Sequence, residues 1–335
     1  MKFFKKLLLG GACALGLLST ASLTSCSSKE ADIISTCFAG YDFARAVKGE
    51  NEDLSLSMLL NPGSDLHDYD PSATDIKAIL NAKVFIYIGG ESDAEWVESD
   101  ILPKIDTEKT QVVNMFDVIG EAALYEEEDP ESAEEEEHHH DEDETASGED
   151  HDHEEEETEY DEHVWTSLSN AKVIVSAIKD AVCKADADNT DTYTANATAY
   201  INDLNEIDTN IQSTIDSSAK KMLIFADRFP LLYFMKEYGL SYDAALGGCS
   251  SSTEVSSNVI AKLKAKIEEN DVNYIFTIEL STKQIAETLK SEVNNSVEIL
   301  TFYTMHNVSK DDFKNGVTYV DMMEKNIEAL SLALN

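Results

Sequence analysis

Short apolar runs alternate with segments of helical periodicity along most of this 335-residue chain. The alternation predicts parallel sheets, because parallel strands need long crossover connections and those connections are usually helices. We expect strands at residues 32–38, 54–60, 84–88, 111–115, 222–226, 274–278 and 298–302. We expect helices at 41–47, from Ser72 onward, and at 169–184, 231–238, 253–268, 284–291 and 319–334, with Ser72 and Asp75 forming a capping box. The predicted fold class is therefore α/β.

One apolar pattern lies outside this alternation and continues without a break. Its positions recur every three or four residues, at Ile201, Leu204, Ile207, Ile211 and Ile215. We interpret the pattern as one long amphipathic helix and expect two Rossmann-like lobes joined by it. The expected division is 26–185 for the N-terminal lobe, 186–220 for the linking helix and 221–335 for the C-terminal lobe. A single large doubly wound domain is the alternative.

The first 25 residues have the layout of a secretory signal peptide. Lys2, Lys5 and Lys6 precede the apolar stretch 7–18, which is too short to span a membrane. The segment ends in Leu-Thr-Ser-Cys, which resembles the bacterial lipobox, whose cysteine receives the lipid. We therefore expect lipidation at Cys26 and an extracytoplasmic protein that is lipid-anchored to the bacterial cell membrane. A retained N-terminal membrane anchor is the alternative.

Acidic residues dominate one internal segment. Residues 126–162 hold 23 acidic residues and five of the eight histidines, without a lysine or arginine. This segment and the net charge of −41 argue against nucleic acid as a partner and favour cations. The composition predicts a disordered insert, because it cannot bury enough apolar area to fold. We expect weak metal capture by its histidines, which are His138, His139, His140, His151 and His153. The alternative is that the insert only keeps the protein solvated.

The other three histidines fall in predicted loops beside regular elements. His67 follows the strand at 54–60, His163 precedes the helix at 169–184, and His306 follows the strand at 298–302. Asp227 follows the strand at 222–226 in the same way. Loops at the carboxyl ends of parallel strands line the crevice where ligands bind, so these four side chains could meet in one cleft. Three imidazoles and a carboxylate would complete a tetrahedral zinc shell. The alternative is that each histidine is an isolated loop residue.

Two of these histidines lie in motifs that resemble a known family. The segment 60–76, which contains His67-Asp-Tyr-Asp-Pro, resembles the signature of the zinc and manganese solute-binding proteins of bacterial ABC transporters. The segment Asp161-Glu-His163-Val-Trp165 resembles the second metal-histidine motif of that family, and the His/acid-rich insert precedes it as in zinc-type members. The resemblance covers nearly the whole mature chain. It implies two α/β lobes bridged by a long helix, with metal held between them.

The chain departs from the family pattern at the third ligand. Family members usually carry histidine or glutamate there, whereas this chain reads Phe-Ala-Asp-Arg-Phe with Asp227 at its centre. We therefore predict the metal shell His67, His163, Asp227 and His306, with Glu279 as an alternative to either of the last two. This nitrogen-rich set favours Zn²⁺. A shell with both Asp227 and Glu279 would be richer in oxygen and would suit Mn²⁺ or Fe²⁺ better.

The function that these observations favour is capture of extracytoplasmic Zn²⁺ for a high-affinity ABC importer. We expect a monomer that delivers the ion to a permease, with the permease and its ATPase on other chains. The sequence contains neither a G-x-x-x-x-G-K-[ST] loop nor an H-E-x-x-H motif, so we expect no enzyme activity. The alternatives are a Mn²⁺ or Fe²⁺ carrier of the same family, a metal-binding adhesion lipoprotein, and a secreted zinc enzyme.

Three cysteines remain once the signal peptide and the lipidated position are set aside. They are Cys37, Cys183 and Cys249, which permit at most one internal disulfide. We interpret all three as small buried hydrophobes.

Overall fold

The strands form two separate parallel sheets. The computed structural model describes residues 30–126 and 160–335, apart from positions 251, 253 and 295. The first sheet has the order β2-β1-β3-β4 and the second has the order β6-β5-β7-β8. The strands are β1 (Ile33–Ser35), β2 (Leu56–Met58), β3 (Val84–Tyr87), β4 (Gln111–Asn114), β5 (Met222–Arg228), β6 (Ser241–Leu246), β7 (Tyr274–Ile278) and β8 (Glu298–Phe302). Every pairing within the two sheets is parallel, which confirms the predicted α/β class.

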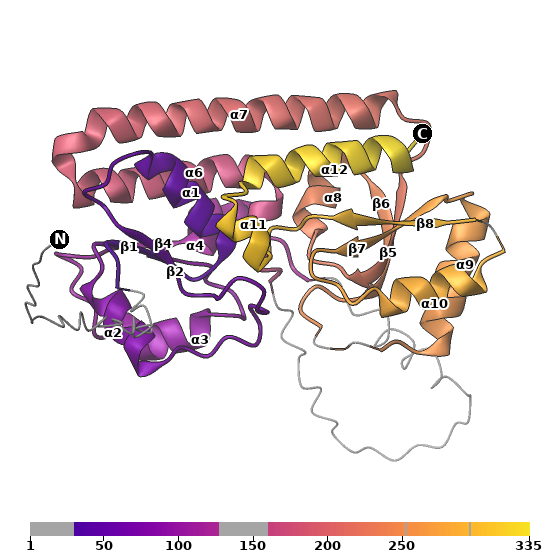
Figure 1. Cartoon of the computed structure of the whole chain (residues 1–335), viewed down its shortest axis with the longest axis horizontal. Helices are drawn as coiled ribbons and strands as arrows, with labels where there is room; N and C mark the ends of the chain where they lie inside the picture. The colour runs from indigo at the N-terminus through magenta and orange to yellow at the C-terminus, as the bar shows by residue number, and fades with distance from the viewer. Residues whose placement is uncertain (1–29, 127–159, 251, 253, 295) are drawn as a thin grey trace, which may run out of the picture.

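Helices surround both sheets (Figure 1). In the first lobe they are α1 (Phe38–Lys48), α2 (Ala73–Asn81), α3 (Ala94–Trp96), the π-helical turn η1 (Val97–Ile101), α4 (Met115–Ile119), η2 (Gly120–Ala122), η3 (Val164–Thr166) and α6 (Leu168–Ala185). In the second they are α8 (Leu232–Tyr238), α9 (Ser257–Glu269), α10 (Gln284–Glu292) and α11 (Lys310–Lys314). The predicted capping box of Ser72 and Asp75 is confirmed at the start of α2.

The second sheet contains a strand that the sequence did not reveal. β6 lies at the edge of the sheet and has the sequence SYDAAL, which has no β-branched residue and little period-two alternation.

The predicted helix at 253–268 begins later, at Ser257, because the Ser256 side chain accepts a hydrogen bond from Val259 N and caps the helix there.

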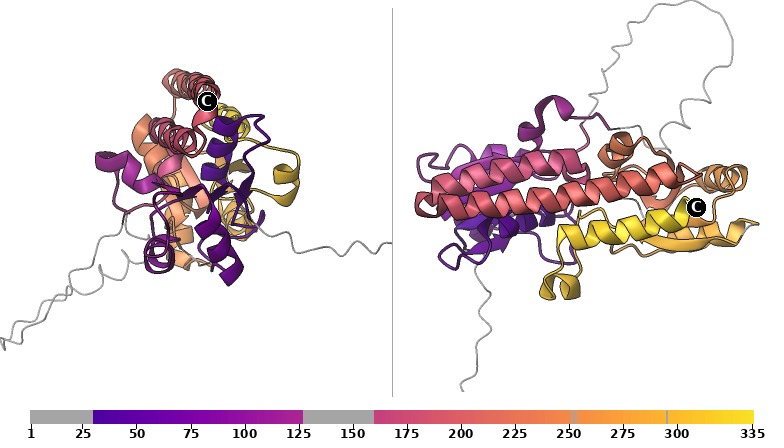
Figure 2. Two further views of the ribbon diagram at one scale, coloured as in Figure 1. Left: turned by 90° about the vertical axis from the view of Figure 1, so that its left-hand side faces the viewer. Right: turned by 90° about the horizontal axis from the view of Figure 1, so that it is seen from above.

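A long helix runs across both lobes. α7 (Thr190–Ser217) follows the short turn η4 (Ala187–Asn189) and lies within the segment 186–220 that was expected to form the linking helix. Its buried positions keep the three-or-four spacing: Tyr193, Ala197, Tyr200, Leu204, Ile207, Ile211 and Ile215. Seen from above, α7 lies beside α6 and beside α12 (Tyr319–Ala333), the helix that closes the chain (Figure 2). The two lobes are therefore packed on a common helical layer.

The buried apolar residues around α7 form one cluster that contains residues of both sheets. Phe38 and Val84 of the first lobe belong to it, as do Phe225 and Phe302 of the second. Polar bonds reinforce this junction. The buried carboxylate of Asp42 accepts hydrogen bonds from Tyr200 Oη on α7 at 3.1 Å and from Tyr319 N on α12 at 2.7 Å. These contacts hold the lobes in one arrangement.

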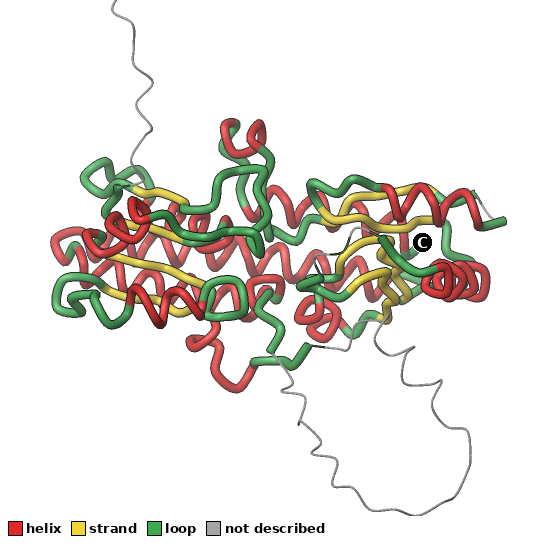
Figure 3. Tube along the Cα trace, turned by 90° about the horizontal axis from the view of Figure 1, so that it is seen from below, coloured by secondary structure: helices red, strands yellow, loops and turns green. Residues whose placement is uncertain are grey.

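Loops fill the region between the two groups of strands (Figure 3). The segments after β2, β3, β6 and β8 all reach this region, so the carboxyl ends of both sheets point toward it. Within the described residues, no helix is both long enough and apolar enough to pass through a bilayer.

The shared core predicts the effect of a cavity in α7. Replacing the fully buried Leu204 with alanine should lower the free energy of unfolding by about 3 kcal/mol, because the substitution removes apolar contacts and leaves a void. The exposed Glu206 of the same helix is the matched control, and Glu206→Ala should change stability by less than about 0.5 kcal/mol. Urea denaturation would measure both. Two separate unfolding transitions in the wild-type protein would contradict a core shared by the lobes.

Candidate metal centre

Three histidines from distant parts of the chain meet between the lobes. His67 lies in the loop between β2 and α2, His163 lies just before η3, and His306 lies in the loop between β8 and α11. The ring centroids are 6.0 Å apart for His67 and His163, 5.0 Å for His67 and His306, and 5.4 Å for His163 and His306. The alternative interpretation, in which each histidine is an isolated loop residue, is therefore wrong.

Within residues 30–126 and 160–335, each of the three rings leaves one nitrogen without a hydrogen-bond partner. The Nε2 atoms of His67, His163 and His306 are buried and unpaired. His163 is completely buried and His306 is 4% exposed. A buried polar atom without a partner costs free energy, so such atoms on three neighbouring rings call for a ligand. His67 belongs to two groups of potential ligand atoms that lie within 4.8 Å of one another, one with His163 and the other with His306. A neutral imidazole nitrogen with a free lone pair is the group that binds Zn²⁺.

The ring of His163 is oriented by the carboxylate two residues before it. His163 Nδ1 lies 3.0 Å from Asp161 Oδ1, and the same oxygen accepts the His163 backbone N–H at 2.7 Å. Donation from Nδ1 to the carboxylate leaves Nε2 as the lone-pair nitrogen, an arrangement typical of metal-binding histidines. Burial lowers the pKa of His163, but the charge of Asp161 and its hydrogen bond outweigh burial and raise it.

The ring of His67 is oriented through a serine. His67 Nδ1 lies 3.1 Å from Ser92 Oγ, and Ser92 donates its hydroxyl and its backbone N–H to the carboxylate of Glu162. A relay from Nδ1–H through the hydroxyl to the carboxylate again leaves Nε2 free. Glu162 fits closely against Gly90, where a Cβ atom would lie 2.2 Å from Glu162 Cβ. The glycine at position 90 is therefore required for this approach.

The loop that carries His306 is held by Glu279. The Glu279 carboxylate accepts hydrogen bonds from Thr304 N at 2.8 Å, Thr304 Oγ1 at 2.7 Å and Asn307 N at 3.2 Å. The residue before His306, Met305, has φ +56°, a left-handed conformation that these bonds help to maintain. Glu279 was the predicted alternative ligand. In this structure both of its oxygens are used to hold the His306 loop.

Asp227 also has other partners. Its Oδ1 accepts a hydrogen bond from Arg228 N at 2.9 Å and its Oδ2 from Ile278 N at 3.3 Å. Among the described residues, two groups of potential ligand atoms lie within 4.8 Å of one another, and neither includes Asp227. Asp227 nonetheless lines, together with His306, one cavity of about 220 Å³, so its ligation stays a prediction.

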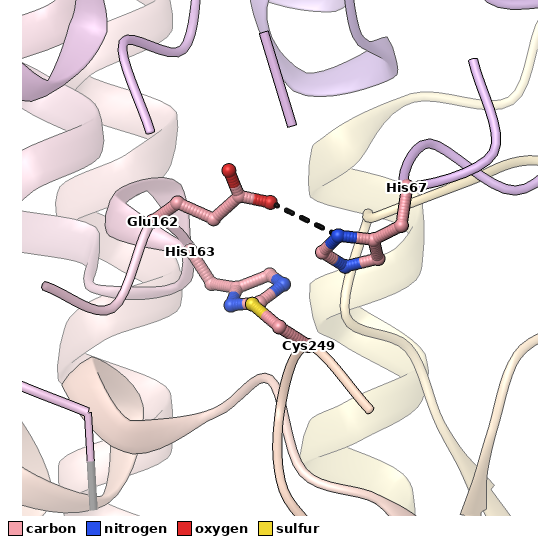
Figure 4. A group of neighbouring side chains, drawn as sticks. All are labelled: His67, Glu162, His163 and Cys249. Carbon is pink, nitrogen blue, oxygen red and sulfur yellow. Dashed lines mark ion pairs between the residues drawn. The ribbon is translucent and has the colours of Figure 1, made fainter. Parts of the chain in front are cut away.

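The two groups of potential ligands share His67. One contains His67, Glu162, His163 and Cys249 (Figure 4), and the other contains Asp65, His67 and His306. Glu162, Asp65 and Cys249 were not predicted to be neighbours of the histidines. Glu162 was hidden at the end of a long acidic run, and no motif marked Asp65 or Cys249.

A cation lies at the edge of the second group. The guanidinium of Arg228 donates to Asp65 Oδ2 at 2.7 Å, so this pair joins β5 to the loop that carries His67. Burial opposes the charge on Asp65, but the hydrogen bond and charge of Arg228 outweigh burial and lower its pKa. Both residues line a cavity of about 220 Å³ that His306 also lines, which gives the histidines an approach from the cleft.

The five histidines predicted to capture metal weakly and the predicted lipidation site at Cys26 lie outside the described residues. The remaining cysteines, Cys37, Cys183 and Cys249, are free thiols. Cys37 is buried, as expected for a small hydrophobe. Cys183 and Cys249 are partly exposed, contrary to that expectation, and Cys249 lies beside the histidines.

Burial keeps two of the rings neutral. Desolvation, followed by the charge of His163, lowers the pKa of His67 to about 4 and that of His306 well below its ordinary value. A histidine whose pKa is lowered by folding contributes stability above its unfolded pKa of about 6.5, and that contribution is lost as pH falls toward the folded value.

The metal-free protein should therefore lose stability in acid through His67. Between pH 7 and pH 5 the unfolded chain takes up a proton at His67 that the folded protein does not bind. The free energy of unfolding should therefore fall by about 2 kcal/mol, a figure that follows from pKa values of about 6.5 unfolded and about 4 folded. Urea denaturation of the chelator-treated protein at both pH values would measure the loss, and His67→Gln should reduce it by that amount. An equal loss in the wild type and in His67→Gln would contradict the prediction.

Sequence comparison places the chain among zinc-uptake proteins. The family model described as ZnuA, the periplasmic component A of a zinc-uptake complex, matches residues 33–333. The zinc-binding lipoprotein AdcA of Streptococcus pneumoniae strain R6 is 30% identical over 324 residues, which are 97% of this chain and 60% of that protein. The high-affinity zinc uptake system protein ZnuA of Bacillus subtilis is 29% identical over 327 residues, which are 98% of this chain and 94% of that protein. This chain thus spans about 60% of the length of its streptococcal relative.

Solved structures agree with this assignment. The metal-dependent lipoprotein YcdH of Bacillus subtilis has a TM-score of 0.69 and 25% identity, covering 90% of this chain and 98% of that one. The periplasmic zinc-binding protein TroA of Treponema pallidum has a TM-score of 0.70 at 22% identity, covering 90% of this chain and 98% of that one, and supports the two-lobe fold alone. Because the family model covers nearly all of the described chain, the protein belongs to the ZnuA family of zinc-uptake solute-binding proteins.

Proposed function

We propose that this chain is the extracytoplasmic Zn²⁺-binding component of a high-affinity ABC importer. The observation that carries the proposal is the meeting of three buried imidazoles whose Nε2 atoms have no partner, at His67, His163 and His306. They come from both lobes, as a site that captures an ion between lobes requires. The names of the relatives AdcA and ZnuA support zinc as the cargo.

The three histidines are the proposed nitrogen ligands. Neutral imidazoles suit Zn²⁺ better than Mn²⁺, which prefers oxygen ligands. The carboxylates of Asp161 and Glu162 act behind the rings, where they fix the orientation of His163 and His67. Asp227 or Glu279 could enter the shell only by exchanging the hydrogen bonds that each now accepts. Their ligation therefore stays a prediction.

The proposed mechanism is capture and release without chemical change of the cargo. Zn²⁺ enters beside the pair of Asp65 and Arg228, where the 220 Å³ cavity reaches His306. The Nε2 lone pairs replace water around the ion, and the carboxylates behind two of the rings strengthen them as donors. A binding protein of this kind needs no catalytic residue, and we propose that the chain is not an enzyme.

The partners follow from the transport role. We propose that the protein works as a monomer, that a lipid on Cys26 tethers it to the outer face of the cell membrane, and that a permease and its ATPase are separate chains. The lipoprotein name of the streptococcal relative supports the tether. The sequence Leu-Thr-Ser-Cys before the mature chain supports it independently.

Loss of a proposed ligand should abolish tight zinc binding. His67→Ala, His163→Ala or His306→Ala should each raise the Kd for Zn²⁺ by more than about 100-fold, which exceeds the 10–100-fold typical for loss of an outer-shell partner. Asp161→Ala should fall within that lower range, because it removes only the support behind His163. Competition with a chromophoric chelator would measure all four. His151→Ala is the control, and its tight site should be unchanged. Tight zinc retained in His306→Ala would remove His306 from the shell.

The His/acid-rich insert should account for weak binding only. Deleting residues 127–159 should remove the weak Zn²⁺ equivalents and leave one tight equivalent, because the insert offers exchangeable sites while the buried histidines remain. Titration calorimetry of the full chain and the deletion variant would compare their stoichiometries. The same number of equivalents in both proteins would contradict a role of the insert in metal capture.

A further inference from the structure

We propose that the thiolate of Cys249 is the fourth ligand of the cargo ion, which gives a shell of three nitrogens and one sulfur. The inference rests on the proposed function and adds to it a sulfur ligand, which the predicted shell of three imidazoles and one carboxylate lacks. Three observations support it. The thiol lies beside the histidines, the Nε2 atoms of these histidines have no partner among the described residues, and the nearby carboxylates already accept other hydrogen bonds.

The loop after β6 brings the cysteine to the histidines. Gly248 lies against the ring of His163, where a Cβ atom would be 3.4 Å from Cε1 and 3.6 Å from Nδ1. On its other side the same Cβ would be 3.2 Å from the backbone oxygen of Phe229. The distance to the Phe229 oxygen is tight and those to the imidazole are ordinary contacts, so the loop runs directly beside the ring of His163. The next side chain along the loop is that of Cys249.

The thiol lies among potential ligand atoms. One atom each from His67, Glu162, His163 and Cys249 lies within 4.8 Å of the others, and Figure 4 shows the sulfur beside the ring of His163. His306 lies outside this group and adjoins it through His67, so the ion would draw the His306 ring toward the thiol. The Nε2 atoms of both histidines are buried and unpaired, and His163 is fully buried. These unpaired nitrogens are independent of the cysteine and point to a ligand in the same place.

The carboxylates nearby are already engaged. Glu162 accepts the hydroxyl and the backbone N–H of Ser92 and so supports His67 from behind. Asp227 and Glu279 accept backbone N–H groups, as described above. The thiol shares a hydrogen bond with the side chain of Glu126. To reach the ion it would exchange that bond, whereas each of these carboxylates would give up at least two hydrogen bonds.

Ligation by Cys249 requires that its proton leaves. The thiol faces the carboxylate of Glu126 and shares a hydrogen bond with it. When the S–H bond breaks and the S–Zn bond forms, the proton passes to that carboxylate and then to solvent. The bound state then has a divalent ion, three neutral imidazoles and one thiolate, with a net charge of +1.

A sulfur ligand would determine which ion the site prefers. Thiolate is a soft ligand that selects Zn²⁺ over Mn²⁺, whereas a carboxylate in the same position would reduce the difference between the affinities for the two ions. The chain would thus keep zinc preference although it lacks the histidine usual at the third family position, where it has Asp227 and Arg228.

Cobalt substitution of the full chain tests the proposal. Co²⁺ in the tight site should give a near-ultraviolet thiolate-to-metal charge-transfer band, and Cys249→Ser should abolish it. Cys183→Ser is the matched control, because Cys183 is also a partly exposed free thiol but is bonded to Thr190 O, away from the histidines. That variant should keep the band. X-ray absorption of the zinc-loaded protein should show one sulfur at about 2.3 Å.

Selectivity provides a second measurement. In Cys249→Asp, which restores an anionic ligand, tight binding should persist without the band, and the preference for Zn²⁺ over Mn²⁺ should fall by at least about tenfold. One tightly bound Co²⁺ without a band in the wild type, or a band that persists in Cys249→Ser, would overturn the sulfur ligand while leaving the transport role intact. Absence of any tight ion in the wild type would overturn both.

Discussion

The indole of Trp165 joins the two loops on which the candidate metal centre depends. Its Nε1 donates to the backbone oxygen of Thr304 at 2.9 Å, so the segment that carries His163 is tied to the segment that carries His306. Trp165 is fully buried, and its own backbone oxygen accepts the hydroxyl of Tyr319 at 2.8 Å. Because Tyr319 begins α12, which packs on α7, the spacing of the two imidazoles is fixed by the core that the lobes share. The two imidazoles are therefore held by a continuous set of contacts that leads into the shared core.

Carboxylates lie close to the metal-free histidine rings, yet burial keeps the rings of His67 and His306 neutral. The carboxylates of Asp161 and Glu162 lie behind His163 and His67 and aim their lone pairs, while burial keeps His67 neutral by lowering its pKa to about 4. Three protonated imidazoles at these separations would repel one another strongly in a low-dielectric interior. Neutral rings are the state that binds an ion, and burial favours that state at His67 and His306, whereas Asp161 raises the pKa of His163. Folding therefore prepares the ligands without requiring that protons be displaced from every ring.

The sequence predicted those parts of the protein that depend on local patterns. Strand and helix alternation, the capping box at Ser72 and the long apolar stripe of α7 each follow from side-chain periodicity within a few turns. The three histidines were identifiable because they lay in loops beside strands and, for two of them, in recognisable motifs. β6 escaped prediction because an edge strand is stabilised by its neighbour β5 more than by its own residues. The residues that surround the histidines were not predicted for a similar reason, because contacts such as that of Gly248 with His163 are tertiary and leave no local sequence pattern.

The shared core also limits how the ion can leave. If both lobes pack on α7 and α12 as one body, a wide opening of the lobes would expose core residues such as Phe225 and Phe302 to water, at roughly 25 cal/mol for each Å² of apolar surface. Movement of the loops costs far less. The ion pair of Asp65 and Arg228 joins the His67 loop to β5 and is only partly buried, so exchange of its partners is among the least expensive changes at the site. A docking partner that offered Arg228 another anion would free the His67 loop without separating the lobes. Release would then depend on this one surface contact, while the frame that orients His163 and His306 stayed intact.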